Sequence, residues 1–260
     1  MTETAAPKAP APVPAIRQIT TQDVFAALRA GLSDFQRAPM FGLFFGAVFS
    51  VFGVLMAAML FYGSAGYWVL PLTAGFPLIG PFAAIGLYEV SRRLASDEPL
   101  SWGAILSAGF TSRSGQLPFF AVVAVFFLLV WIVIARVVFA VTFGTASMTN
   151  VMTSIEVYTT FEGLSMLLIG GVVGAALAGL LFSITVIGVP ILLDRDIDVV
   201  TAMITSFKAT VENQGPMMLW GLIVAGATLV AALPLFLGMV LIFPMLGHSA
   251  WHLYRAVIAP

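Results

Sequence analysis

Long apolar runs without charged residues constrain this chain more than any other feature. Pro39–Tyr62 contains no Asp, Glu, Lys or Arg, and Pro118–Phe143 contains only Arg136. A helix needs about 20 apolar residues to cross the hydrocarbon core of a bilayer, and both runs are longer than that. Charged residues make up 9% of the 260 residues, which is too few to coat a soluble domain of this size. We therefore expect an all-α polytopic membrane helix bundle.

The apolar runs divide into six expected transmembrane helices. They lie at about residues 39–62, 67–88, 118–143, 164–193, 216–234 and 238–258. The fourth run is longer than a straight crossing needs, which predicts tilt or protrusion. The last two come from one apolar stretch that is too long for one crossing, and we divide it near Pro234–Gly238. We expect one integral membrane domain over residues 19–260, preceded by a disordered Pro/Ala-rich cytoplasmic tail over residues 1–18.

Basic residues predict the orientation of these helices. Lys and Arg beside membrane spans are retained on the cytoplasmic side. The chain has 11 Lys and Arg, and all except Arg136 flank the spans on the same side. The loop Thr145–Glu162, on the opposite side, has none. Both termini are therefore predicted to be cytoplasmic, in the bacterial inner membrane.

Three cytoplasmic segments share an amphipathic pattern that leads into a span. Their expected helix N-caps are Asp23, Ser101 and Asp198, because Asp and Ser side chains accept hydrogen bonds from the first turn of a helix. We expect three interfacial helices and interpret the pattern as a three-fold internal repeat of helix plus hairpin. The alternative is that the pattern reflects only the alternation of amphipathic loops and spans that is common in membrane proteins.

The most specific motif of the chain is Gly80–Arg93, which reads GPFAAIGLYEVSRR. Shorter motifs accompany it, at Ala27–Gly31, Asp34–Phe35, Ser101–Trp102, Gly188–Pro190 and Trp251–Arg255. Together they resemble the bacterial inner-membrane family catalogued as domain of unknown function 2189, over about residues 16–258. The resemblance implies a six-span membrane protein without an established activity.

Four ionisable residues in or near the expected spans are candidate functional residues. They are Glu89, Arg136, His248 and His252. The two histidines lie four residues apart on one helix, so both imidazoles project from the same face. They are interpreted either as a metal edge or as hydrogen-bonding groups near the membrane interface.

The other two candidates each have a structural alternative. Glu89 stands three and four residues before Arg92 and Arg93, the spacing of a helical ion pair; otherwise it serves as a proton or cation site with a histidine. Arg136 lies inside the third span, where it is expected to reach the interface or to pair with Glu156 or Glu162.

Small residues predict close helix packing in two of the expected spans. Gly42 and Gly46 repeat at an interval of four residues, as do Gly170 and Gly174. This spacing places two glycines on one helix face and lets another backbone approach closely. Packing within the bundle is the first interpretation, and contact with a second protein is the alternative.

The function expected from these features is non-enzymatic. The chain has no Cys and two His, which excludes thiolate chemistry and the haem and copper ligands of an oxidase catalytic subunit. No catalytic, cofactor-binding or metal site is assigned, and nucleic acid is not an expected partner. We expect an accessory, assembly or scaffold protein beside another membrane complex, of which a respiratory complex is one candidate. The alternative is a small transporter or channel using Glu89, Arg136, His248 and His252. The oligomeric state stays open.

Overall fold

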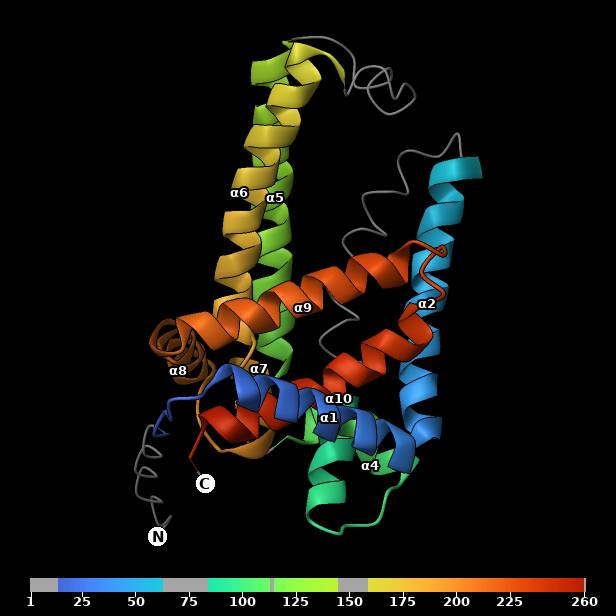
Figure 1. The fold of residues 1–260 in the computed structure, drawn as a ribbon, viewed down its shortest axis with the longest axis vertical. Coiled ribbons are helices and arrows are strands. Elements are labelled where there is room, and N and C mark those ends of the chain that lie inside the picture. The colour runs from blue at the N-terminus through green and yellow to red at the C-terminus, as the bar shows by residue number, and fades with distance from the viewer. Residues whose placement is uncertain (1–13, 63–83, 113–114, 145–158, 260) are drawn as a thin grey trace, which may run out of the picture. The chain divides into compact units, whose positions relative to one another are not determined.

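The computed structural model describes residues 14–62, 84–112, 115–144 and 159–259. Apart from one isolated β-bridge, the regular structure of these residues is helical (Figure 1). The helices are α1 (Thr21–Arg37), α2 (Pro39–Tyr62), α4 (Trp102–Thr111), α5 (Pro118–Phe143), α6 (Phe161–Thr185), α7 (Gly188–Asp194), α8 (Val199–Glu212), α9 (Gln214–Ala232) and α10 (Met239–Val257), with a further helix over residues 84–95. The expected all-α architecture is therefore confirmed.

Four stretches of the described chain are long and apolar enough to cross a membrane. They are Pro39–Ala58, Pro118–Phe143, Phe161–Asp194 and Gln214–Ala232. The expected span at 67–88 lies mostly outside the described residues. The expected span at 238–258 corresponds to α10, which is not among the four; its apolar sequence contains His248, His252 and Arg255. The described chain thus supports a multi-span membrane protein, with fewer candidate spans than the six expected.

The expected span over residues 164–193 consists of two helices rather than one. The helix α6 ends at Thr185 and α7 begins at Gly188. Pro190 lies in the first turn of α7, where its missing N–H leaves no helical hydrogen bond unmade. At the break, the backbone N–H of Ile187 donates to the Ser206 hydroxyl at 3.1 Å. The α8 side chain therefore satisfies a donor that the interrupted helix releases.

Three short helices follow the expected amphipathic segments, and one of them begins at a different residue. Ser101 caps α4 and Asp198 caps α8, each accepting a hydrogen bond from the first turn. The expectation that Asp23 caps the first helix is wrong. Thr20 is the N-cap of α1, and Asp23 accepts from the Thr20 backbone N–H at 2.7 Å. Asp23 is thus the third residue of a capping box.

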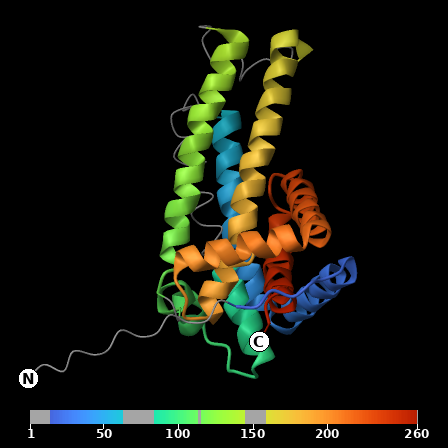
Figure 2. The same ribbon diagram turned by 90° about the vertical axis from the view of Figure 1, so that its left-hand side faces the viewer.

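The chain divides into two compact units, residues 1–121 with 184–260, and residues 122–183. In the larger unit, α10 packs beside α1 and α2 (Figures 1 and 2). Phe49 of α2 stacks on Phe243 of α10 with ring centroids 4.2 Å apart. Phe45, Phe49 and the fully buried Leu87 belong to one hydrophobic cluster. This core joins α2, the helix over residues 84–95 and α10.

The two ends of the described chain pair with each other. Ile16 and Ile258 form the isolated antiparallel bridge. The Arg17 N–H donates to the Val257 carbonyl at 2.7 Å, and the Ala259 N–H donates to the Ala15 carbonyl at 3.0 Å. Residues 15–17, assigned from sequence to the disordered tail, are thus held by residues 257–259.

Candidate functional site

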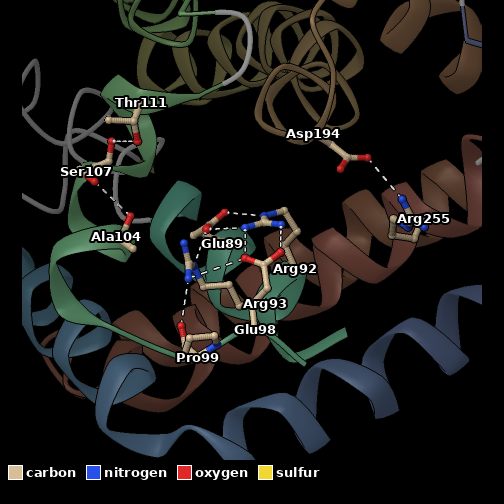
Figure 3. A network of polar contacts seen from close by, with 10 residues as sticks. All are labelled: Glu89, Arg92, Arg93, Glu98, Pro99, Ala104, Ser107, Thr111, Asp194 and Arg255. Carbon is tan, nitrogen blue, oxygen red and sulfur yellow. Dashed lines mark hydrogen bonds and ion pairs between the residues drawn. The ribbon is translucent and has the colours of Figure 1, made fainter. Parts of the chain in front are cut away.

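A network of charged side chains lies at the end of the helix over residues 84–95 (Figure 3). The Glu89 carboxylate accepts from Arg92 Nε at 2.8 Å and from Arg93 Nε at 2.6 Å. Glu98 accepts from Arg92 Nη1 at 2.7 Å. Hydrogen bonds from Arg92 to Glu89 and then to Glu98 raise the pKa of the Arg92 guanidinium. The ion pair expected for Glu89 is therefore present, and a second carboxylate joins it.

Local backbone geometry assembles this network. The helix places Glu89, Arg92 and Arg93 on one face through their three- and four-residue spacing. Just after the helix, Asp97 adopts a φ of 53°, a left-handed conformation that Asp tolerates better than most residues. The Glu98 N–H then donates to the Arg93 carbonyl at 2.9 Å. This turn brings Glu98 back over the arginines.

The network borders a pocket of about 370 Å³. We call it the Arg92–Arg93 pocket. Its lining residues are Glu89, Arg92, Arg93, Glu98, Ala104, Ser107, Ala108, Thr111, Ser112 and Leu193. The Ser112 hydroxyl is buried and has no hydrogen-bond partner among the described residues. The pocket is mostly polar and touches only one of the four candidate functional residues, Glu89.

Replacement of Glu89 by Gln tests how much this network contributes to the stability of the protein. Only 6% of the Glu89 side chain is exposed. The variant therefore removes the buried negative charge that pairs with the guanidinium groups of Arg92 and Arg93. Losing charged hydrogen bonds costs about 1.5–3 kcal/mol, and we expect a clear drop in thermal unfolding temperature. The matched control is Glu98→Gln, because that side chain is 38% exposed. Equal losses in both variants would contradict a buried role for Glu89.

A second polar cluster joins three helices. His252 of α10 and Asp34 of α1 are 2.7 Å apart, Nε2 to Oδ2. His248 of α10 and Ser91, on the helix over residues 84–95, are 2.8 Å apart, Nδ1 to Oγ. Asp34 is 5% exposed, and Ser91 and His248 are fully buried. The two histidines therefore share one cluster, as their spacing predicts, and both contact residues of other helices.

Proton positions in this cluster follow from the charge of Asp34. Burial by itself raises the pKa of Asp34, but hydrogen bonds from His252 and Ser91 and the nearby histidines outweigh it and hold the pKa below its ordinary value of 3.8. The ionised carboxylate only accepts, so His252 Nε2–H donates to it. The Ser91 hydroxyl shares a hydrogen bond of 2.8 Å with His248 Nδ1, and Ser91 also contributes to the lowered pKa of Asp34.

Sequence reasoning did not single out Asp34 and Ser91 as cluster residues. The available signal was the position of Asp34: the buried face of α1 consists of Val24, Ala27, Gly31 and Asp34. A carboxylate on an otherwise apolar helix stripe requires a partner. Among the described residues, no group of three or more His, Cys, Asp and Glu could hold a metal ion. The histidines here bind Asp34 and Ser91.

Arg136 lies apart from both clusters in the chain, within the unit of residues 122–183. Its side chain is exposed, and it forms no ion pair with Glu162 in the described part of the chain. The other expected partner, Glu156, lies outside the described residues. The geometry therefore shows Arg136 at the surface of its own unit, where its long side chain can reach an interface.

The packing glycines differ in what surrounds them. A Cβ at Gly46 would lie 2.4 Å from the Val240 carbonyl oxygen, and one at Gly42 would lie 2.5 Å from the Phe35 ring. One at Gly174 would lie 3.1 Å from Trp131, whereas one at Gly170 would meet nothing within 4 Å. The α2 glycines thus contact α1 and α10, and Gly170 faces open space in the described chain.

Several long apolar helices, buried polar clusters between helices and scarce charges define a polytopic α-helical membrane protein. Comparison with known families gives the same class: the model of the family DUF2189, described as predicted integral membrane protein, matches residues 69–194. This match includes Glu89, Ser91, Arg92, Arg93 and Glu98 and confirms the resemblance to this family over residues 69–194, a shorter range than the sequence indicated. No curated protein and no solved structure matches the chain.

Proposed function

We propose that this protein is a non-enzymatic scaffold or assembly partner of another membrane protein complex. The observation that carries the proposal is the contrast between ionisable side chains that contact neighbouring helices and apolar helix faces that are exposed. Glu89, His248 and His252 are engaged by neighbouring side chains. A transport path needs polar groups that a permeating ion can reach. The Arg92–Arg93 pocket reaches Glu89 but neither histidine, so the transporter alternative has less support.

The apolar face of α5 is the proposed partner surface. Its exposed residues recur at intervals of three and four: Val122, Phe126, Leu129, Val133 and Val137. Each is between 56% and 65% exposed, and this spacing forms one continuous stripe along a helix. In the same unit, a Cβ added at Gly170 of α6 would have no neighbour within 4 Å. A glycine at such a position lets a second helix approach closely.

The proposed setting is the bacterial inner membrane, with six spans, three interfacial helices in a three-fold repeat and both termini in the cytoplasm. The pairing of residues 15–17 with residues 257–259 supports one part of this topology. Two paired ends lie on the same side of a membrane, so the number of crossings between them is even. Six crossings satisfy this condition, and the basic residues beside the spans favour the cytoplasmic side.

Site-specific crosslinking tests the scaffold proposal. A photoreactive residue at Val133, 61% exposed, should capture a stoichiometric membrane partner in native membranes. The same residue at Leu128 on α5 is the control, because that position is 8% exposed and should capture nothing. Mass spectrometry identifies the product, and mild-detergent purification should recover the same partner. A lone monomer that moves ions in liposomes would overturn the proposal in favour of the transporter.

A further inference from the structure

The Arg92–Arg93 pocket lies where membrane-crossing segments of the chain begin and end. Leu193, which lines it, is next to the end of the candidate span Phe161–Asp194. Ser112, which also lines it, precedes the start of α5 at Pro118 by six residues. A Cβ at Gly188 would lie 2.9 Å from the Phe120 ring, so α7 and the beginning of α5 are in contact. If these stretches cross the membrane, a pocket at their ends lies at the level of the lipid headgroups.

Among the described residues, the charge of the pocket lining is balanced. Arg92 and Arg93 oppose Glu89 and Glu98, which gather within hydrogen-bond distance of one another (Figure 3). A simple anion entering the pocket would meet two carboxylates, and a simple cation would meet two guanidinium groups. A ligand that carries both charges on neighbouring atoms avoids both repulsions. The lining thus favours a zwitterion.

Donors for the negative end of such a ligand are available. Arg93 donates through Nε to Glu89 and through Nη1 to the Pro99 carbonyl, while its Nη2 forms no hydrogen bond within the described residues. The buried Ser112 hydroxyl also has no partner there. A phosphate oxygen accepts from a guanidinium and a hydroxyl at once. These two groups are the phosphate end of the site.

Acceptors for the positive end lie on α4 and on the loop before it. The hydroxyls of Ser107 and Thr111 donate to the carbonyls of Ala104 and Ser107, which leaves their oxygens as acceptors. Glu98 is the most exposed carboxylate of the network at 38%, and a carboxylate oxygen accepts more than one hydrogen bond. A primary ammonium group has three N–H donors for such a set.

We propose that the Arg92–Arg93 pocket binds a phosphate ester beside a primary ammonium group, the headgroup chemistry of an ethanolamine phospholipid. The volume of about 370 Å³ lies within the range of small-molecule sites. A choline headgroup lacks N–H donors, and a glycerol headgroup lacks the cation. The pocket therefore discriminates between lipids whose phosphates are the same.

Native mass spectrometry of the full-length protein in mild detergent tests this site. Ethanolamine, choline and glycerol phospholipids with identical acyl chains are added in turn. The ethanolamine lipid should bind about tenfold more tightly than the other two, the scale expected from losing one charged hydrogen bond. Equal retention of all three lipids would overturn the proposal.

Two variants connect the binding to the pocket. Ser112→Ala and Arg93→Gln should each weaken binding of the ethanolamine lipid about tenfold. The controls Ser33→Ala and Arg37→Gln change exposed residues of α1 and should leave binding unchanged. Thermal unfolding is recorded for each variant. Ser112→Ala removes no internal hydrogen bond of the described chain, so this variant is expected to fold even if Arg93→Gln does not. Undiminished lipid binding by Ser112→Ala would overturn the proposed site.

Soluble glycerophosphoethanolamine distinguishes a membrane lipid from a free phosphoethanolamine compound as the ligand. Competition with the bound lipid at millimolar concentration shows that the headgroup is recognised by itself, so that a free phosphoethanolamine compound is also a ligand. Retention of the lipid without such competition assigns the site to the membrane lipid. Both outcomes support recognition of the ethanolamine headgroup, whereas competition by glycerophosphocholine at the same concentration contradicts it.

Discussion

Asp34→Ala is expected to lower the free energy of unfolding by about 1–3 kcal/mol, because it removes the buried acceptor of the hydrogen bond from His252. His252 Nε2, at 2.7 Å, would lose its partner between α1 and α10, and only its exposed quarter can turn to water instead. The loss should separate α1 from α10 before α10 itself unfolds. Fluorescence of Trp251, which is 2% exposed on α10, reports the change during thermal unfolding in detergent.

A double-mutant cycle with Asp34→Asn and His252→Gln isolates the contact between these two side chains. We expect a coupling free energy of about 1–2 kcal/mol. Ser33→Ala, on the exposed face of α1, controls for changes in helix propensity and should be neutral. Additive losses in the double variant would contradict a direct contact.

The Asp34 contact also predicts a dependence on pH. The pKa of Asp34 is below 3.8 in the folded protein, because hydrogen bonds outweigh the effect of burial. Its contribution to stability is therefore complete well above pH 3.8 and decreases as the pH falls through the folded pKa. The stability difference between the wild type and Asp34→Asn should be constant at neutral pH and shrink in acid. A difference that grows in acid would contradict this assignment.

Gly46→Ala is expected to destabilise the protein by about 1–3 kcal/mol through overpacking. The added Cβ would lie 2.4 Å from the Val240 carbonyl oxygen and 2.9 Å from its Cα. These are backbone atoms of α10, so no side-chain rotation relieves the clash. The helices α2 and α10 must move apart, and the stacked rings of Phe49 and Phe243 would separate with them. Thermal unfolding should begin several degrees lower, by roughly 3–8 °C.

Gly170→Ala is the matched control for this substitution. Both glycines lie inside long apolar helices, so the gain in helix propensity is similar. Nothing lies within 4 Å of a Cβ at Gly170, and the variant should be as stable as the wild type or slightly more stable. Equal destabilisation of both variants would show that helix contact is not the cause. If Gly170→Leu loses a crosslinked partner while keeping its unfolding temperature, the open face of α6 is a contact surface.

The helices and their starting residues followed from local chemistry. Apolar runs predict α2 and α5, because lipid solvates uniformly apolar helices and few soluble alternatives bury them. Side-chain caps predict where α4 and α8 begin, because Ser101 and Asp198 each bond within four residues. The break before α7 was harder to foresee, since Pro190 alone is tolerated in many membrane helices.

The contacts between helices did not follow from local chemistry. His252 and Asp34 are separated by 218 positions, and His248 and Ser91 by 157. Periodicity places the two histidines on one face, yet it does not select the helix that this face meets. The Glu89 network was predictable because its arginines lie within four residues, whereas Glu98 joins only through the left-handed turn at Asp97.

The pairing of the chain ends sets an order for biogenesis. The buried face of α1 packs against α10, and the backbone of residues 15–17 bonds with residues 257–259. A ribosome releases α1 before α10, and chains generally fold in the order of their synthesis. Before α10 is made, α1 therefore contacts chiefly α2 and α9, and the face that carries Asp34 lacks its partner His252. Truncation of the last helix should release α1 for proteolysis in a membrane that still contains α2, α5 and α6.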